Sequence, residues 1–226
     1  DLGLELLEGY GMSEDFAYSH ATMPGQARVG YVGSPMPGVD VKISDEGEIL
    51  IKSPGCMMGY FKQPEMTAEC FTEDGYFKTG DRGERDEQGR LKITGRVKEL
   101  FKTSKGKYVA PAPIENLLNN HPEVELCCVT GSGNPQPYAL ILPAEELRPK
   151  LDDPADRSRF ESELNTLLDS VNREVEAFER LQFLVVVKDP WAIENGFLTP
   201  TMKIKRSKIE DNYGPMSDGW YTAGER

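Results

Sequence analysis

The sequence predicts an α+β protein with two domains, a β-rich one over residues 1–97 and a mixed α/β one over 98–226. The first observation is that short segments of alternating apolar and polar residues, separated by turn residues, fill the first part, as in half-buried strands. The second is that apolar residues recur at helical spacing over 160–178. The pattern changes at 96–98, which therefore marks the domain boundary.

Two strand pairs are expected in the first part. Residues 39–43 and 48–51 alternate around an acidic turn that ends in glycine, which predicts a hairpin. A second pair is expected from 75–81 and 90–94, which flank another short polar turn. Only 64–71 favours a helix in this part, because a proline stands at its first turn, where helices accept it.

The second part opens with a polar hairpin. Its strands are expected at 100–102 and 107–109, and Pro111 follows as the first residue of a helix. Two short apolar segments, 126–130 and 138–142, then predict strands.

A long helix is expected next, with Asp153 as its cap. Apolar residues occupy one face of it: Phe160, Leu164, Leu167, Leu168, Val171, Val175 and Phe178. The continuous, β-branched run 181–187 predicts a buried strand, and 203–212 a short C-terminal helix.

Composition narrows the function classes. A formal net charge of −12 argues against nucleic acid or an anionic membrane surface as the main partner. The longest apolar run is far too short to span a bilayer, although peripheral membrane association and the oligomeric state stay open. His20 and His121 lack the spacing of a metal site or a triad. Four cysteines without metal-ligand spacing indicate a reduced, cytoplasmic protein.

Four polar motifs interrupt this framework. Residues 9–14 (GYGMSE) combine glycines that allow close backbone approach, an aromatic ring suited to a flat base, and a carboxylate that suits Mg²⁺. Residues 77–81 (FKTGD) end in a carboxylate able to accept both hydroxyls of a ribose. Taken alone, each motif is better explained as an ordinary turn.

The other two motifs lie further along the chain. Residues 93–99 (ITGRVKE) contain an arginine, a forked donor for hydroxyls or phosphate oxygens. Residues 198–206 (LTPTMKIKR) place a lysine after a rigid turn, where it can meet charge that develops on a phosphate or carboxylate. The simpler interpretation of both is solvated basic surface.

In their order and spacing, the four motifs resemble the adenylate-forming superfamily, which includes acyl-CoA synthetases, firefly luciferase and the adenylation domains of peptide synthetases. The TPTMK sequence at 199–203 and the length of the 103–106 loop are most similar to long-chain fatty acyl-CoA synthetases. The resemblance implies that 1–97 is the C-terminal part of the large domain, a distorted, barrel-like β-rich subdomain. Residues 98–226 would be a mobile α+β lid domain that carries the catalytic lysine.

The resemblance also implies roles for residues of the first motif. Tyr10 would flank the adenine, with Gly11 beside the nucleotide. Ser13, where most members carry threonine, would contact the phosphates. Glu14 would bind the Mg²⁺ that accompanies ATP.

Roles follow for the remaining positions as well. Asp81 and Arg96 would hold the ribose hydroxyls, and Lys98 matches the hinge about which the lid domain swings. Lys203 matches the lysine that steadies the carboxylate and α-phosphate, although Met202 replaces the glycine common before it. Gly106 is similar to the glycine that lines the pantetheine tunnel.

The activity implied is that of an ATP-dependent, AMP-forming acid–thiol ligase. It would activate a fatty acid as an acyl-adenylate and transfer the acyl group to CoA, with the chain length left open. The phosphate-binding loop and acyl pocket of the family lie upstream of Asp1, so residues 1–226 alone are expected to be inactive. Two alternatives remain: a ligase that loads a carrier-protein phosphopantetheine, and a non-catalytic module that binds a nucleotide or a partner protein.

Overall fold

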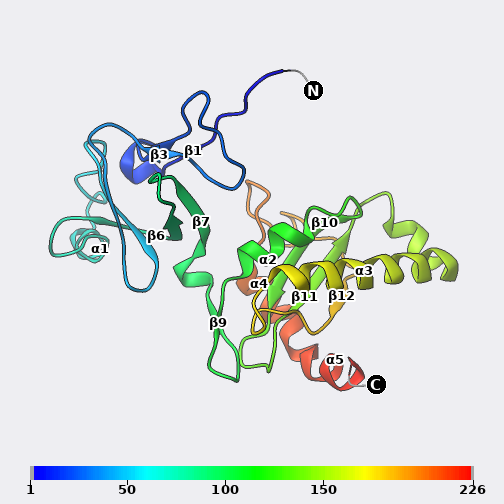
Figure 1. Cartoon of the computed structure of the whole chain (residues 1–226). Coiled ribbons are helices and arrows are strands. Elements are labelled where there is room, and N and C mark those ends of the chain that lie inside the picture. Colours follow the sequence, from blue (N-terminus) through cyan, green and yellow to red (C-terminus); the bar gives the residue numbers. More distant parts are fainter. Residues whose placement is uncertain (1–2, 225–226) are drawn as a thin grey trace. The chain divides into compact units, whose positions relative to one another are not determined.

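The computed structural model describes residues 3–224, and the chain divides into two compact units, Asp1–Glu99 and Leu100–Arg226. Strands dominate the first unit, whereas the second contains both strands and helices (Figure 1). The predicted α+β class is therefore confirmed. None of the helices in the described part is long and apolar enough to cross a membrane.

The main sheet of the first unit contains both predicted strand pairs. It is antiparallel and runs in the order β4 (Asp40–Ile43), β5 (Glu48–Lys52), β6 (Phe77–Arg85) and β7 (Leu91–Arg96). The expected hairpin over 39–51 is present, with Val41 opposite Ile51. Its apolar face is the core of the unit, formed by Val41, Ile49, Ile51, Phe77 and Leu91.

A second sheet in this unit holds the N-terminal segment. Its strands have two residues each: β1 (Gly9–Tyr10), β2 (His20–Ala21) and β3 (Ser34–Pro35). Such short strands form few ladder bonds, and although Leu91 of β7 exchanges backbone hydrogen bonds with Val32 and Gly33 just before β3, the sheets within residues 3–99 do not close into a barrel. The barrel-like arrangement expected here is therefore corrected to two open sheets. The short helix α1 (Pro64–Glu69) begins at the proline, as predicted.

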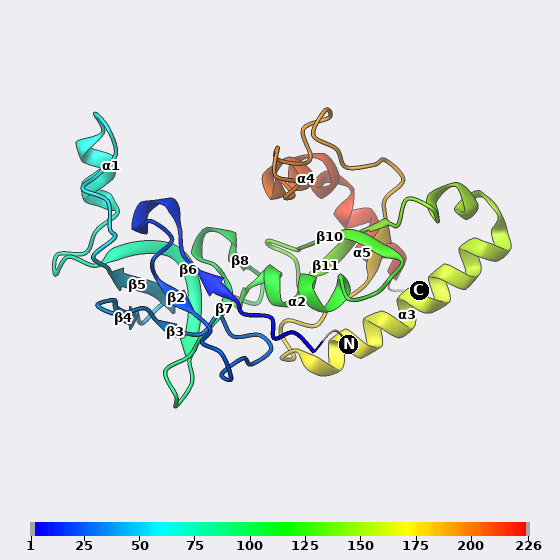
Figure 2. The same ribbon diagram turned by 90° about the horizontal axis from the view of Figure 1, so that it is seen from above.

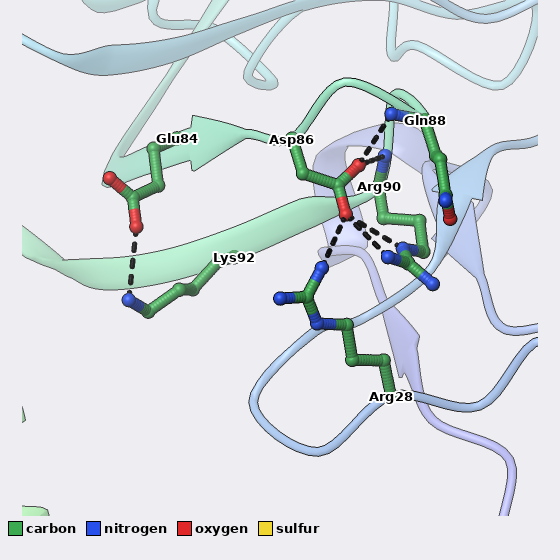
Figure 3. Close-up of polar contacts among 6 residues, drawn as sticks. All are labelled: Arg28, Glu84, Asp86, Gln88, Arg90 and Lys92. Atoms are coloured by element: carbon green, nitrogen blue, oxygen red, sulfur yellow. Dashed lines mark hydrogen bonds and ion pairs between the residues drawn. The ribbon is translucent and has the colours of Figure 1, made fainter.

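An ionic cluster fastens the turn between β6 and β7 to the loop before β3 (Figure 3). Asp86 accepts hydrogen bonds from Arg28 Nη1 at 3.1 Å and from Arg90 Nε at 2.8 Å. Burial raises the pKa of Asp86, but the hydrogen bonds from Arg90 and Gln88 outweigh it and leave this pKa below its usual value. The loop is thereby held against the hairpin that carries Asp81 and Arg96 on its strands.

The second unit is built on a three-stranded sheet. β10 (Val124–Thr130) pairs antiparallel with β11 (Tyr138–Pro143), and β12 (Leu184–Val186) pairs parallel with β11. A small hairpin of β8 (Phe101–Lys102) and β9 (Tyr108–Val109) precedes it. All of these strands lie within or close to the predicted segments, but β12 is shorter than the expected 181–187 and only partly buried.

Helices cover both faces of this sheet, as Figures 1 and 2 show. Alternate residues such as Cys127 and Ile141 pack against α2 (Pro111–Leu118) and α3 (Pro154–Glu174). Their neighbours Cys128 and Leu140 pack on the opposite side, against α4 (Arg206–Tyr213) and α5 (Ser217–Gly224). The period-2 alternation of a strand thus supplies two cores, one on each face.

Two helix boundaries differ from the sequence prediction. Asp153 caps α3 by accepting a hydrogen bond from the Ala155 amide at 2.8 Å, as expected. The helix ends at Glu174, because Val175 is already extended; Val175 and Phe178 still pack on the core from the following segment. The C-terminal helix begins at Arg206, so Lys203 lies in a turn ahead of it.

Candidate functional site

Three of the predicted site residues meet in the first unit. Asp81 on β6 is the register partner of Arg96 on β7, and Arg96 Nε lies 2.9 Å from Asp81 Oδ1. The Tyr10 hydroxyl, on β1, donates a hydrogen bond to Asp81 Oδ2 at 2.8 Å. One carboxylate oxygen of Asp81 therefore contacts Arg96, and the other accepts the hydrogen bond from Tyr10.

The environment of Asp81 combines burial with an exposed edge. Asp81 is 8% exposed, whereas the Arg96 side chain is 63% exposed. Burial, together with the nearby negative charge of Asp81, raises the pKa of Tyr10, so this phenol stays a neutral donor. A carboxylate oxygen can accept more than one hydrogen bond, so Asp81 retains capacity for the hydroxyls of a sugar.

Gly11 is required by the folding of its own turn. A Cβ atom at this position would lie 2.6 Å from the Cα of Ala17, a distance that no side chain tolerates. The chain doubles back here, and the Ala17 amide donates to the Met12 carbonyl at 2.8 Å. The close approach that calls for glycine in this structure is therefore that of the chain to itself.

Asp15, which the sequence interpretation missed, holds this turn together. It is fully buried, and its Oδ1 accepts a hydrogen bond from the Met12 amide at 2.9 Å. The following residues, Phe16 and Ala17, have φ angles of 58° and 53°, a region unfavourable for residues with a Cβ. Met12 has no strong side-chain acceptor for a reciprocal bond, so the sequence lacks a standard capping box here and gave no clear signal for Asp15.

The same turn carries Ser13, which is exposed, and Glu14, which is half-buried. Glu14 Oε1 accepts a hydrogen bond from the Tyr60 hydroxyl at 2.9 Å, and this bond raises the pKa of Tyr60 to about 12. Within residues 3–224 no group of three or more acidic, histidine or cysteine side chains gathers as a metal site. A single carboxylate still suits Mg²⁺, which proteins hold through one or two carboxylates together with substrate phosphates.

Lys203 lies on an exposed, tightly bonded turn of the second unit. The Thr199 amide donates to the Lys203 carbonyl at 2.8 Å, and the Lys203 amide donates to Thr199 Oγ1 at 3.1 Å. Met202 has a φ of 61°, so the turn adopts the left-handed geometry that glycine prefers at that position. The backbone is held while the lysine side chain faces solvent.

Gly106 and Lys98 occupy separate local structures. Gly106, with a φ of 79°, lies at the tip of the β8–β9 hairpin, where its amide donates to the Thr103 carbonyl at 2.9 Å. The Ser104 amide donates to the Asn134 carbonyl at 2.9 Å, which ties the tip to the loop between β10 and β11. Lys98 is exposed in the single turn η2 (Val97–Glu99), which ends the first unit.

Two family models match the chain. The model described as the AMP-binding enzyme C-terminal domain matches residues 99–225, and the model described as AMP-binding enzyme matches residues 1–61. Together they cover parts of both compact units.

Two curated relatives of the chain are long-chain-fatty-acid–CoA ligases. Long-chain-fatty-acid–CoA ligase FadD15 of Mycobacterium bovis is 34% identical over 93% of this chain and 37% of its own length. Long-chain-fatty-acid–CoA ligase 1 of Homo sapiens is 32% identical over 98% of this chain and 35% of its own length. The chain thus spans about a third of the length of the curated relatives it matches.

Solved structures show the same fold. The adenylation domain of a carboxylate reductase from Mycobacterium chelonae matches 96% of this chain and 34% of its own, with a TM-score of 0.75 and 27% identity. The A-PCP didomain of the carboxylic acid reductase from Segniliparus rugosus, in complex with AMP, matches 97% of this chain and 32% of its own, with a TM-score of 0.75 and 28% identity.

Proposed function

The chain belongs to the AMP-binding enzyme family, as its four motifs predict, and on this premise we propose that it is the C-terminal portion of a long-chain fatty acyl-CoA synthetase. One observation carries the proposal at the level of residues: Asp81 holds Tyr10 and Arg96 at its two oxygens, in the first unit of the chain. That arrangement suits a nucleoside, because it joins an aromatic ring, an acceptor for ribose hydroxyls and a cation.

The nucleotide would be held by the first unit. Asp81 accepts the ribose hydroxyls, with Arg96 donating beside it, and the ring of Tyr10 flanks the adenine. Gly11 and Ser13 lie on the adjoining turn, where the Ser13 hydroxyl donates to a phosphate oxygen. Glu14 would bind Mg²⁺, which withdraws charge from the phosphate oxygens when bound. The neutral phenol of Tyr10 keeps Asp81 oriented through its hydrogen bond.

Lys203 would act in the first half-reaction. The fatty acid carboxylate forms a bond to the α-phosphorus of ATP, and the bond from that phosphorus to the pyrophosphate oxygen breaks. Negative charge crowds onto the reacting oxygens, so a fixed ammonium there lowers the barrier. The bonded turn of Thr199 to Lys203 presents such a charge on a restrained backbone.

The second half-reaction transfers the acyl group to CoA. The thiol sulfur forms a bond to the acyl carbon, the carbon–oxygen bond to AMP breaks, and the thiol proton passes to solvent. The Gly106 hairpin would line the path of the pantetheine arm, because a glycine tip leaves room for a narrow ligand. Exchange of the Lys203 turn for this hairpin would be a hinge motion about Lys98.

A second candidate is a ligase that loads a carrier protein instead of free CoA. It is favoured by the similarity to an A-PCP didomain at a TM-score of 0.75. Both candidates share the adenylation chemistry and differ only in the acceptor of the acyl group.

The test compares the chain alone with a longer enzyme that carries it as its C-terminal part. Residues 1–226 alone are expected to form no acyl-CoA from ATP, CoA and a long-chain fatty acid. The longer enzyme is expected to release pyrophosphate and form the thioester, whereas its Lys203→Ala variant loses adenylation by roughly 10²-fold or more and still converts synthetic acyl-adenylate. Acyl transfer to a phosphopantetheinylated carrier protein but not to CoA would favour the second candidate. An active chain alone, or two half-reactions unaffected by Lys203→Ala, would contradict the proposal.

A further inference from the structure

A largely buried ion pair joins two helices of the second unit. Arg206, the first residue of α4, donates from Nη2 to both oxygens of Glu115 on α2, at 2.8 and 3.0 Å. The side chains are 13% and 11% exposed, so water screens the pair weakly. The planar guanidinium carries several N–H donors in fixed directions, so its contacts fix direction as well as distance, which a point charge cannot do.

Strand β10 completes this contact between the two helices. Arg206 Nη1 donates to the Val129 carbonyl at 2.8 Å, and the Val129 amide donates to Glu115 Oε1 at 2.8 Å. Next to it, Thr130 Oγ1 donates to Glu210 Oε1 on α4 at 2.7 Å. Strand β10 and the helices α2 and α4 are therefore joined by one network of hydrogen bonds.

The network lies at the base of both loops to which catalytic roles are assigned above. Arg206 follows the Lys203 turn by three residues, with only the partly buried Ile204 and the exposed Lys205 between. Glu115 lies on the helix that directly follows the β8–β9 hairpin with Gly106 at its tip. The ion pair thus links the segments from which the two loops project.

We propose that Glu115 and Arg206 are positioning residues that hold the Lys203 turn and the Gly106 hairpin as parts of one rigid body. Neither loop then shifts by itself, and each occupies the active site in a fixed orientation only when the whole unit turns. The catalytic meaning of this rigid body rests on the function proposed above, whereas the mechanical coupling does not.

Hydrogen exchange of the chain tests the coupling directly. In Glu115→Gln the guanidinium loses its charged partner, and the Lys203 turn is expected to loosen. The amides of Thr199, Met202, Lys203 and Lys205, which are hydrogen-bonded in the turn, should exchange roughly tenfold faster or more, relative to the β11 amides of the same variant. Exchange of the turn at the wild-type rate would overturn the proposal.

An apolar double variant separates positioning from stability. Breaking a buried pair destabilises, but replacing both members by apolar residues of similar volume is often neutral or better. Glu115→Leu with Arg206→Met leaves no buried charge unpaired, although the amide and carbonyl of the buried Val129 lose their side-chain partners. It is therefore expected to unfold at a higher midpoint than Glu115→Gln and still show fast exchange in the turn. If the single variant does not fold, this double variant decides: wild-type exchange in its turn overturns the proposal. Arg206→Lys keeps the charge but lacks the forked donors. The amides of its Lys203 turn are expected to exchange at a rate between those of the wild type and the double variant.

A matched control and an activity assay complete the design. Arg159 pairs with Glu123 and Glu163 on the exposed side of the same unit, so Arg159→Gln should leave the turn unchanged. In the longer enzyme, the apolar double variant is expected to lower kcat of adenylation roughly tenfold or more, with little change in the KM for ATP. An inactive unsubstituted enzyme would refute the proposed function and leave the exchange result standing. An active enzyme whose kcat is unaffected by the double variant would refute the positioning role.

Discussion

Asp81 and Arg96 face each other as register partners on β6 and β7, with Arg96 Nε 2.9 Å from Asp81 Oδ1. The register of a hairpin therefore sets the distance between an acceptor and a donor that the sequence places in two different motifs. Tyr10 reaches the other oxygen of the same carboxylate from a separate sheet.

Asp81→Asn in the longer enzyme is expected to weaken ATP binding. The amide keeps the shape of the side chain, but it loses the negative charge and presents an NH₂ group to one of two donors. The loss of charge-assisted hydrogen bonds costs about 1.5–3 kcal/mol, which corresponds to a rise in the KM for ATP of roughly tenfold to a hundredfold. Asp74→Asn, in an exposed turn where Asp74 contacts Lys42, serves as the control. An unchanged KM would remove Asp81 from the nucleotide site.

Met202→Gly is expected to stabilise the second unit by up to about 1 kcal/mol. The φ of 61° at Met202 strains a residue with a Cβ, and its side chain is 62% exposed, so little buried area is lost. Chemical denaturation of the chain measures the effect. Met216, which is 52% exposed in the single helical turn η4 (Gly214–Met216), is the control, because glycine there should destabilise. If glycine changes the free energy of unfolding equally at Met202 and at Met216, the backbone at Met202 is not strained.

Gly11→Ala is expected to destabilise the first unit by about 1–3 kcal/mol or to disorder its N-terminal turn. The added methyl group would lie 2.6 Å from the Cα of Ala17, and because the nearest atoms are all backbone atoms of Ala17, no side chain can move aside to relieve the clash. Gly214→Ala offers the matched case, because its φ is −52° and no atom lies within 4 Å of a Cβ built there. Proteolysis within residues 8–18 and thermal unfolding together report the difference. A Gly11→Ala variant as stable as the wild type would show that the turn can open without cost.

The free energy of unfolding is expected to depend on pH through the titration of His20. Burial, with the nearby positive charge of Arg85, lowers the pKa of His20 to about 4, and the side chain is only 2% exposed. Between pH 6.5 and 4 the unfolded state binds the proton and the folded state does not, so the free energy of unfolding falls as pH falls. The slope from this one group reaches about 1.4 kcal/mol for each pH unit.

Urea unfolding of the chain at a series of pH values measures this slope. His20→Asn keeps a polar atom for Ser19 Oγ, which lies 2.8 Å from His20 Nδ1, and removes the titrating ring. The difference between the two pH profiles isolates His20 from the carboxylates that titrate in the same range. Parallel profiles would show that folding does not lower the pKa of His20.

The sequence alone was sufficient for the fold class, the family and the strands of residues 3–224 other than the two-residue β1, β2 and β3, which it did not predict. These depend on local pattern: alternation identifies the strands of both units, prolines mark the starts of α1, α2 and α3, and four motifs in order identify the AMP-binding enzymes. Chain periodicity reports which face of an element is buried, and that is enough to define the class, whereas the strand order of each sheet came only from the structure. The polar motifs, and the family that they resemble, identified Tyr10, Asp81 and Arg96 as separate candidates.

Tertiary structure alone decided which of these residues touch and what supports them. The Glu115–Arg206 pair joins two helices, and its contact depends on how they pack, so no local pattern encodes it. The end of α3 at Glu174 and the left-handed turn at Met202 were set by packing and hydrogen bonding against helical propensity. Local sequence sets the periodicity of each element, whereas packing sets the distances between elements, and the site depends on those distances.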